Sequence, residues 1–395
     1  ELARRTPPIW IEALSGGEVT QIVTLCAGLR RIAPGVPLLL SSNNDYARSF
    51  AREHIPSLDA VFETPWDIGP IVRGALGRVR PRALMFVENV YSPILAKEAR
   101  RGGIPTVLLS GLVRPAFAPH AIYRRAFGLR FYEHIDHFIV KSPLDAGALA
   151  GLGIGGERVR VAGNLKFDDT HLQVPEEETA RLRAELGLDG VCPVLVAGSL
   201  HEREDGLVLD AFGDVLRRHP GARLLLVPRY NHLLPGIEAR LEREGLPFRR
   251  RTPRGMEGPA GAPVVLVSTF GELFRLYAVG DAAILGGSFF LRHGVGFSQN
   301  IVEPLIHRKP VFFGPFARQF EEITAALEGA WEGLRCRTGE ELAAGILRLL
   351  EDEAIREATR ERIEQILEAN RRTLEDHLAA LDLILNRPDK RISAG

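Results

Sequence analysis

The chain has 395 residues, of which 45% are apolar and 25% are charged, with equal numbers of acidic and basic side chains. This composition excludes a fibrous or wholly disordered protein, and at roughly 100–200 residues per domain the length predicts two or three domains. No run of 18 apolar residues occurs, which excludes a transmembrane helix in this sequence. Three cysteines without metal-site spacing indicate a reducing compartment.

Charge is distributed unevenly along the chain. Residues 1–165 contain 20 Lys or Arg and 14 Asp or Glu, whereas the remainder contains 30 and 36. A basic half indicates a phosphate-bearing or membrane-surface partner, and chance asymmetry between solvated faces explains it equally well.

The first half alternates short Val-, Ile- and Leu-rich runs with amphipathic segments, the pattern of a doubly wound parallel sheet. The predicted strands are Ile9–Ala13, Pro37–Ser41, Ala60–Glu63, Ala83–Val87, Thr106–Ser110, His137–Val140 and Val159–Ala162. The predicted helices between them include Val19–Ile32, Pro93–Arg101 and Pro143–Leu152.

The pattern pauses at the polar segment Gly163–Val174 and then begins again. The later predicted strands are Val194–Ala197, Arg223–Val227, Val264–Val267, Ala282–Leu285 and Pro310–Phe313. The predicted helices are Glu176–Leu186, Glu204–Arg217, Leu233–Glu244, Glu272–Val279 and Asn300–His307, Pro253–Pro263 is a predicted loop, and Glu351–Asn386 is helical. Two such α/β units predict a cleft, with ligands at the carboxyl ends of the strands.

Three segments at predicted strand ends carry candidate chemistry. Ser15–Glu18 opens a helix, and its free N–H groups suit a ligand, although Ser and Gly followed by Glu also make an ordinary helix cap. Arg229 follows a strand, where it either binds a phosphate or faces solvent. Gly286–Ser288 is a predicted phosphate loop, and Glu303 in the next helix is a predicted partner of a ribose diol.

Gly111–Ile135 interleaves basic and aromatic residues at helical spacing. This pattern suits a membrane surface or an anionic lipid, and it suits equally an amphipathic helix whose aromatic side chains are core. Nucleic acid is a weaker fit, because no recognition motif accompanies the segment.

Taken together, these motifs resemble, in nearly the same order, those of the bacterial 3-deoxy-D-manno-octulosonic acid (Kdo) transferase family. The matching segments are Ser15–Val19, Glu88–Ile94, Gly163–Asp168, Ser199–Glu204, Pro228–Tyr230, Gly271–Leu273, Gly286–Ser288 and Asn300–Pro304. The hexapeptide Gly163–Asp168 matches the family's Gly-Asn-Leu-Lys-Phe-Asp at every position and is the most specific of them.

The resemblance implies a GT-B fold of two Rossmann-like domains. Residues 1–165 are then an acceptor-binding domain, residues 166–365 bind the nucleotide-sugar, and residues 366–395 form a helix that packs back on the first domain. It implies inverting, metal-independent transfer of a sugar acid from a CMP-sugar to a lipid acceptor such as a lipid A precursor, with no cofactor. It places the protein in peripheral contact with the cytoplasmic face of the inner membrane, and leaves an anchor upstream of Glu1 open.

The resemblance also implies roles for individual residues. Glu18 is the expected general base, and Lys166 is expected to balance negative charge on the donor. The expected donor-binding residues are Ser199, His201, Glu202, Arg229, Gly271, Glu272, Gly286, Gly287, Ser288, Asn300 and Glu303. The expected acceptor-binding residues are Gly16, Gly17, Glu88 and Arg114, and no metal ligands are expected.

The chain departs from the family pattern mainly in the first half. The second carboxylate, the Trp and the Asn of the family's acidic motif are replaced by Val90, Ser92 and Ile94. The family's arginine in Asn-Ala-Arg-Leu-Ser falls on Leu112, with Arg114 two residues away. A different acceptor is one consequence, and two alternatives stay open: a UDP-sugar epimerase or hydrolase, and a non-catalytic paralogue that binds a nucleotide or lipid.

Overall fold

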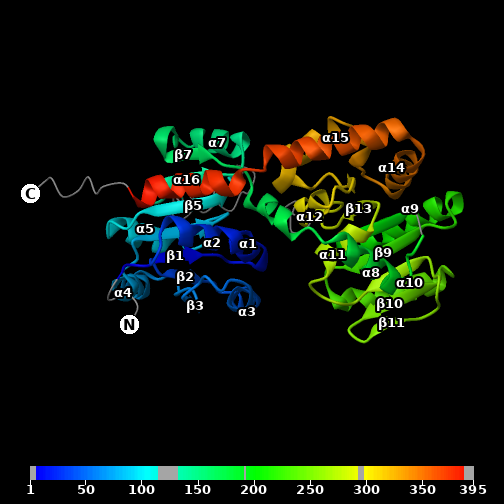
Figure 1. Ribbon diagram of the computed structural model, residues 1–395, viewed down its shortest axis with the longest axis horizontal. Helices are drawn as coiled ribbons and strands as arrows, with labels where there is room; N and C mark the ends of the chain where they lie inside the picture. The colour runs from blue at the N-terminus through cyan, green and yellow to red at the C-terminus, as the bar shows by residue number, and fades with distance from the viewer. Residues whose placement is uncertain (1–5, 114–131, 191–192, 292–297, 387–395) are drawn as a thin grey trace, which may run out of the picture. The chain divides into compact units, whose positions relative to one another are not determined.

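The computed structural model describes residues 6–113, 132–190, 193–291 and 298–386. The chain forms two compact units, one from Glu1–Asp169 with Asn370–Gly395 and the other from Thr170–Ala369 (Figure 1). Each unit is a parallel-dominated sheet with covering helices, so the predicted α/β class is confirmed. Arg114 and most of the basic-aromatic segment lie outside the described residues.

Among the described residues, the first unit has a seven-stranded parallel sheet in the order β3-β2-β1-β4-β5-β6-β7. Its strands are β1 (Ile9–Glu12), β2 (Leu38–Ser41), β3 (Ala60–Phe62), β4 (Ala83–Val87), β5 (Thr106–Gly111), β6 (His137–Val140) and β7 (Val159–Val161). The chain runs outward from β1 to β3 and returns to β4 on the other side of β1. The strand order therefore reverses between β1 and β4, which is where ligands bind in such sheets.

Helices cover both faces of this sheet. They are α1 (Gly16–Gln21), α2 (Val23–Ile32), α3 (Asp45–His54), α4 (Gly69–Val79), α5 (Pro93–Arg101), α7 (Pro143–Ala150) and α16 (Thr373–Leu385), with 3-10 turns η2 (Gly156–Arg158) and η3 (Leu165–Leu172). Side chains at alternate strand positions join opposite cores, as Ile9 and Ile11 do on one face and Trp10 on the other.

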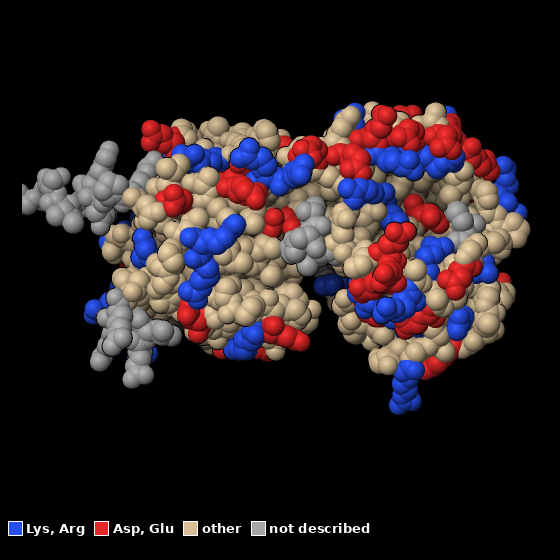
Figure 2. Space-filling view, in the orientation of Figure 1, with Lys and Arg blue, Asp and Glu red and all other residues tan. Residues whose placement is uncertain are grey.

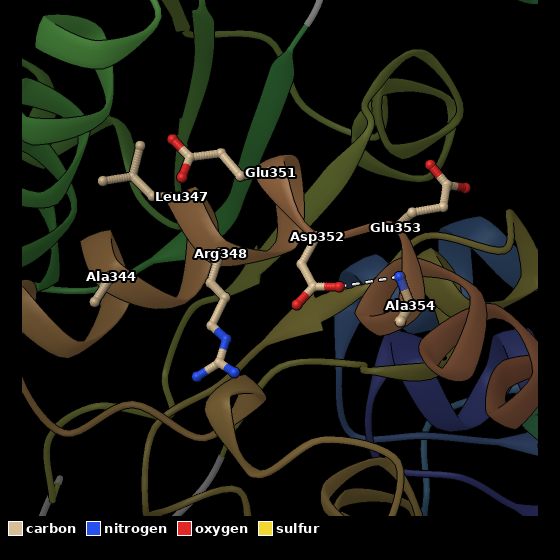
Figure 3. A pocket seen from close by; sticks show the side chains of 7 residues that line it. All are labelled: Ala344, Leu347, Arg348, Glu351, Asp352, Glu353 and Ala354. Carbon is tan, nitrogen blue, oxygen red and sulfur yellow. Dashed lines mark hydrogen bonds between the residues drawn. The ribbon is translucent and has the colours of Figure 1, made fainter.

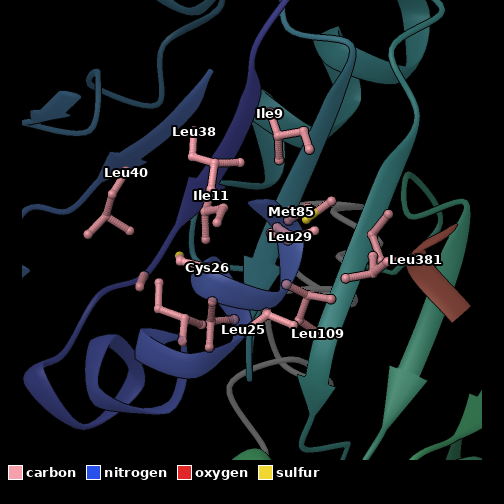
Figure 4. Close-up of a cluster of buried hydrophobic side chains, with 14 of the residues drawn as sticks. Ile9, Ile11, Leu25, Cys26, Leu29, Leu38, Leu40, Met85, Leu109 and Leu381 are labelled. Carbon is pink, nitrogen blue, oxygen red and sulfur yellow. The ribbon is translucent and has the colours of Figure 1, made fainter. Parts of the chain in front are cut away.

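The core on the α2 face includes a contribution from the end of the chain. Leu25 and Leu29 of α2 pack with strand residues such as Met85, and Leu381 of α16 closes the cluster (Figure 4). Gly28 lets α16 approach closely, because a Cβ there would meet Leu378 Cδ1 at 2.5 Å. The C-terminal helix is thus part of the first unit's core.

The described part of the second unit has a seven-stranded sheet in the order β11-β10-β12-β9-β8-β13-β14. Its strands are β8 (Val194–Leu200), β9 (Arg223–Pro228), β10 (Phe248–Thr252), β11 (Gly255–Glu257), β12 (Val264–Val267), β13 (Ala282–Leu285) and β14 (Val311–Phe312). The order reverses between β8 and β13. All pairings are parallel except that of β10 with β11.

The predicted loop Pro253–Pro263 is wrong in part, because Gly255–Glu257 forms the edge strand β11. It pairs with β10 across a tight turn, and Thr252 Oγ donates to Gly255 O at 3.2 Å. An edge strand this short needs only backbone pairing and no apolar alternation, so its sequence resembles a loop.

The helices of the second unit are α8 (Glu176–Leu186), α9 (Glu204–Arg218), α10 (Leu234–Arg243), α11 (Leu273–Val279), α12 (Val302–Ile306), α13 (Glu321–Glu328), α14 (Gly339–Glu351) and α15 (Glu353–Ala369). Short 3-10 turns are η4 (Asn231–Leu233), η5 (Arg318–Phe320) and η6 (Glu332–Leu334). No helix in the described ranges is long and apolar enough to span a bilayer. Figure 2 shows both signs of charge on the visible face of each unit.

Candidate active site

The helix that follows β1 begins with a complete capping box. Ser15 Oγ accepts from Glu18 N at 3.2 Å, while Glu18 Oε2 accepts from Leu14 N at 2.6 Å and Ser15 N at 3.4 Å. A Cβ at Gly16 would meet Tyr46 Cε1 at 2.8 Å, so the exposed Tyr46 ring would have to shift to admit a larger residue. The capping interpretation of Ser15–Glu18 is confirmed.

The second oxygen of Glu18 contacts a hydroxyl. Tyr91 donates its O–H to Glu18 Oε1 at 3.3 Å, so this oxygen already accepts the kind of hydrogen bond that an acceptor hydroxyl makes. Glu18 is 3% exposed, and burial followed by the charge of Glu88 raises its pKa to about 7. A carboxyl with this pKa exchanges a proton readily near neutral pH.

Glu88 lies directly after β4 in a left-handed conformation, with φ 59°, an uncommon geometry that is often found at functional positions. Its Oε1 accepts from Gln21 Nε2 at 2.8 Å and from two ammonium groups, Lys141 Nζ at 2.5 Å and Lys166 Nζ at 2.9 Å. Burial alone would raise the pKa of Glu88, but Lys141 and Lys166 hold it well below its usual range. Glu88 is therefore ionised.

The hexapeptide Gly163–Asp168 brings Lys166 to this cluster. Gly163 has φ 84°, and a Cβ there would collide with Thr373 of α16. Asn164 Oδ1 accepts from Lys166 N at 3.2 Å, and Leu165 N donates to Ser110 Oγ at 3.4 Å. These contacts fix the backbone of the hexapeptide, and its Lys166 side chain reaches Glu88.

The first unit thus brings Glu18, Glu88, Lys166 and the Gly16–Gly17 turn together at the carboxyl ends of β1 and β4. Gln21 joins them, since its Nε2 donates to both Gly17 O at 3.0 Å and Glu88. This is the position at which the strand order reverses.

Three charged residues of this region were not predicted from the sequence: Lys141, Glu12 and Asp67. Lys141 follows β6, and Glu12 is the last residue of β1. Ser92 donates its hydroxyl to Glu12, and burial raises the pKa of Glu12 to about 8. Asp67 accepts from Ile94 N at 3.0 Å and Leu95 N at 2.8 Å, which caps α5. A charged residue within an apolar strand was the available signal for Glu12.

In the second unit, Glu204 organises the loops after β8 and β13. Its Oε2 accepts from His201 N at 2.9 Å and Gly287 N at 2.7 Å, and its Oε1 accepts from Phe289 N at 3.0 Å. Gly286 passes close against Ser199, whose φ is 53°, and a Cβ at Gly286 would collide with Ser199 O. The buried carboxylate of Glu204 thus joins the predicted phosphate loop, Gly286–Ser288, to the loop that follows β8.

Several predicted donor residues gather around these loops. Ser288 Oγ donates to Leu285 O at 2.5 Å and accepts from Gly314 N at 2.9 Å. Gln299 Nε2 lies 3.0 Å from His201 Nε2. Asn300 Nδ2 donates to Glu303 Oε1 at 3.2 Å at the start of α12, where Pro304 is tolerated in the first turn.

Arg229 is exposed at the end of β9, and its backbone N–H donates to Leu200 O at 2.7 Å. Its guanidinium carbon lies 5.9 Å from the Tyr230 ring, which meets His201 edge-on at 5.6 Å. Glu202 Oε1 lies 3.5 Å from His232 Nε2. Arg229, Glu202 and His201 therefore share one end of the sheet.

Glu272 occupies a different environment, next to Gly271 with φ 79°. Arg251 donates to both of its oxygens, at 3.0 and 2.8 Å, and also binds Glu185 at 2.8 Å. The hydrogen bonds from Arg251 lower the pKa of Glu272. This ion pair gives Glu272 a structural role, and its predicted contact with the donor stays a prediction.

A surface hollow in the second unit lies at the junction of α14 and α15. It is lined by Ala344, Leu347, Arg348, Glu351, Asp352, Glu353 and Ala354 (Figure 3). Asp352 Oδ1 accepts from Ala354 N at 3.0 Å, an ordinary cap for α15. None of the predicted site residues lines it. Within the described ranges, no cluster of His, Cys, Asp and Glu is arranged to hold a metal ion.

Solved structures similar over nearly the whole chain define the class of fold. The Anabaena HepE protein in complex with UDP aligns with a TM-score of 0.66 at 16% identity, covering 95% of this chain and 99% of that one. UDP-GlcNAc 2-epimerase from Neisseria meningitidis bound to UDP-GlcNAc aligns with a TM-score of 0.59 at 10% identity, covering 92% and 99%. Together with the two Rossmann-like units, these define a GT-B fold.

Sequence relatives are more specific. The family model for 3-deoxy-D-manno-octulosonic acid transferase matches residues 1–169. The 3-deoxy-D-manno-octulosonic acid transferase of Bordetella pertussis is 28% identical over 363 residues, covering 90% of this chain and 82% of the relative. That of Chlamydia pneumoniae is 27% identical over 356 residues, covering 89% and 79%. These relatives show that the chain is similar to Kdo transferases over most of its length, and they support a divergent member of that family and a glycosyltransferase.

Proposed function

We propose that this enzyme transfers a sugar acid from a CMP-sugar to a hydroxyl of a lipid acceptor such as a lipid A precursor, with inversion and without a metal ion. The observation that carries the proposal is the buried carboxyl of Glu18, whose Oε1 accepts a hydroxyl hydrogen bond and whose pKa is raised to about 7. Sequence similarity to Kdo transferases supports the choice of donor.

In this mechanism Glu18 Oε1 takes the proton of the acceptor hydroxyl. The hydroxyl oxygen attacks the anomeric carbon from the face opposite the nucleotide, which inverts its configuration. The bond between that carbon and the phosphate oxygen breaks, and CMP departs with the electron pair. The exposed guanidinium of Arg229 supplies positive charge for the leaving phosphate.

Glu204 fixes the loop that carries Gly286, Gly287 and Ser288, so we propose that this loop shapes the nucleotide pocket. The N–H of Gly287 and the hydroxyl of Ser288 are engaged within the protein. Their contribution to donor binding is therefore the shape of the loop and its remaining backbone groups. Asn300 and Glu303, paired at the start of α12, are the proposed ribose contacts.

The proposed acceptor site is the Glu18–Glu88 region of the first unit, and peripheral contact with the cytoplasmic face of the inner membrane is part of the proposal. Trp66 is 72% exposed, and Ile68 and Ile71 beside it are about half exposed, at the start of α4. Exposed apolar side chains in one short segment favour contact with lipid.

The test is an assay with CMP-Kdo and a lipid A precursor in detergent, with EDTA present. The proposal predicts release of CMP and a lipid product that is heavier by one sugar acid, observed by mass spectrometry. Structures of similar fold were solved with UDP or a UDP-sugar bound, so a UDP-sugar is the alternative substrate to test. Conversion of a UDP-sugar without any acceptor, and no product from CMP-Kdo, would instead assign an epimerase or hydrolase.

A further inference from the structure

Lys141 has no place in the function proposed so far, although it lies within the same cluster. It follows β6, and its backbone N–H donates to Gly111 O at 3.2 Å across the neighbouring strand. Its side chain is 9% exposed, and its ammonium binds Glu88 Oε1 at 2.5 Å. A lysine buried to this extent needs an ionised partner, and Glu88 provides it.

Lys141 lies close in the fold to Leu112, the position at which the chain lacks an arginine of the Kdo transferase pattern. The resemblance aligns a family arginine with Leu112, which is buried and follows Gly111 at the end of β5. Gly111 pairs with Val140 at the ends of β5 and β6, after a shift in register, and Leu112 and Lys141 are the residues that follow these two strand ends. Lys141 therefore places a cation at the end of the strand next to β5.

We propose that Lys141 is a further positioning residue of the active site, which acts through Glu88 to set the charge next to Glu18. The proposal rests on the role of Glu18 as the base. Lys141 fixes the Glu88 carboxylate, Gln21 links that carboxylate to the Gly17 turn, and Glu18 is one residue further along α1. Three segments far apart in sequence thereby determine one local charge.

Several charged and titratable groups surround the cluster of Lys141, Glu88 and Glu18. Lys141 faces Glu88, Lys166 and Asp145, and the buried His377 of α16 lies within its electrostatic reach. Glu18 faces Glu88, Lys166 and Tyr91, with Glu12 on the strand before it. Replacing Lys141 by a neutral residue makes the surroundings of Glu18 more negative, while replacing Glu88 by Gln makes them more positive.

The experiment compares the pH dependence of kcat/KM for sugar transfer in the full chain and in single variants. Lys141→Met should move the acidic limb of the profile to higher pH, and Glu88→Gln should move it to lower pH, each by roughly one pH unit. Lys141→Arg, which keeps the charge, should restore the original limb. Lys97→Met, a lysine of α5 outside the cluster, is the matched control and should leave the limb unchanged.

Opposite displacements of the limb support the proposal, because a loss of stability alone would lower activity at every pH. An unchanged limb in Lys141→Met would overturn it, whatever Glu88→Gln does. If Lys141→Met does not fold, Lys141→Gln takes its place, and an unchanged limb in that variant would overturn the proposal. Failure of the base assignment is separately visible, since Glu18→Gln would then retain turnover.

Discussion

At the residue scale, the buried carboxyls of Glu12 and Glu18, near the end of β1, have pKa values above those of exposed carboxyls. Burial is the main cause for both, and it raises the pKa of Glu12 to about 8 and that of Glu18 to about 7. Glu88, whose side chain is 13% exposed, is held ionised by two lysines, which lower its pKa. One small region therefore contains two carboxyls whose pKa is raised and one whose pKa is lowered.

Glu12 makes the stability of the protein depend on pH. The native state keeps a proton that the unfolded chain releases above about 4.5, so stability is highest at low pH and falls as pH rises from 4.5 through 8. Glu12→Gln removes this loss, which is on the order of 5 kcal/mol. In urea unfolding, the variant should match the original protein at pH 4 and exceed it at pH 9.

The control for this comparison is Glu63→Gln, at an exposed position after β3. It should leave the pH dependence of unfolding as it is in the original protein. A Glu12→Gln variant that is equally less stable at both pH values would show that the carboxyl makes an essential ionic contact instead.

Glu18 should control the rate. Ionisation of the base makes kcat/KM rise with pH through about 7. Glu18→Gln should lower kcat by roughly 10²–10⁴-fold while leaving the melting temperature nearly unchanged, because Gln also serves in a capping box. Steady-state kinetics from pH 5 to 9 with thermal melts of both proteins checks this, and full turnover by the variant would exclude Glu18 as the base.

At the element scale, the loops after β8 and β13 are joined by Glu204. Glu204→Gln keeps an oxygen acceptor but loses the charge that binds three backbone N–H groups, so we expect a loss of about 1–3 kcal/mol in unfolding free energy. Nucleotide affinity should fall as well, measured by calorimetry. Glu242→Gln on the exposed face of α10 is the matched control, and equal behaviour of the two variants would contradict the role of Glu204.

The C-terminal helix α16 should behave as part of the first unit. Leu381 is fully buried among residues of α2 and the first sheet. Leu381→Ala should therefore cost roughly 2–5 kcal/mol in unfolding free energy, measured in urea. The exposed Leu383 on the same helix supplies the control, since Leu383→Ala should change stability by less than about 0.5 kcal/mol. Similar losses in both would mean that α16 does not dock as described.

The elements differ in how readily the sequence predicts them. Buried parallel strands are continuous apolar runs, so every strand of the first sheet was predictable. β10, with the sequence Phe-Arg-Arg-Arg-Thr, was missed. Its Arg251 is buried only because Glu272 and Glu185, distant in sequence, pair with it. No local pattern reveals such a pairing.

The same limit applies to the site. Glu18 stood out as part of a glycine-rich helix start, whereas Glu88 and Lys166 were identified only through the resemblance to Kdo transferase motifs. The structure brings the three together. The roles of Lys141 and Glu204 depend on partners 53 and 83 residues away in the chain. Such roles require the sheet order, which places the ends of β4 and β6, or of β8 and β13, within reach of one side chain.

At the scale of the whole molecule, each unit has its candidate residues where its strand order reverses. In the first unit these residues are carboxylates and lysines, suited to proton transfer and to anionic groups. In the second they are an arginine, an aromatic pair and a loop fixed by Glu204, suited to a nucleotide. The proposed transfer requires such a division, with the proposed acceptor site in the first unit and the proposed donor site in the second.

The proposed use of a CMP-sugar is tested by the thermal stability of the full chain with CMP, UDP, GDP or ADP at millimolar concentration. A nucleotide at 100 times its Kd stabilises the native state by about 2.7 kcal/mol, enough to raise the melting temperature by several degrees. We expect such a rise with CMP and a much smaller one with the other three nucleotides. A rise selective for UDP or GDP, or none with any nucleotide, would contradict the proposed use of a CMP-sugar.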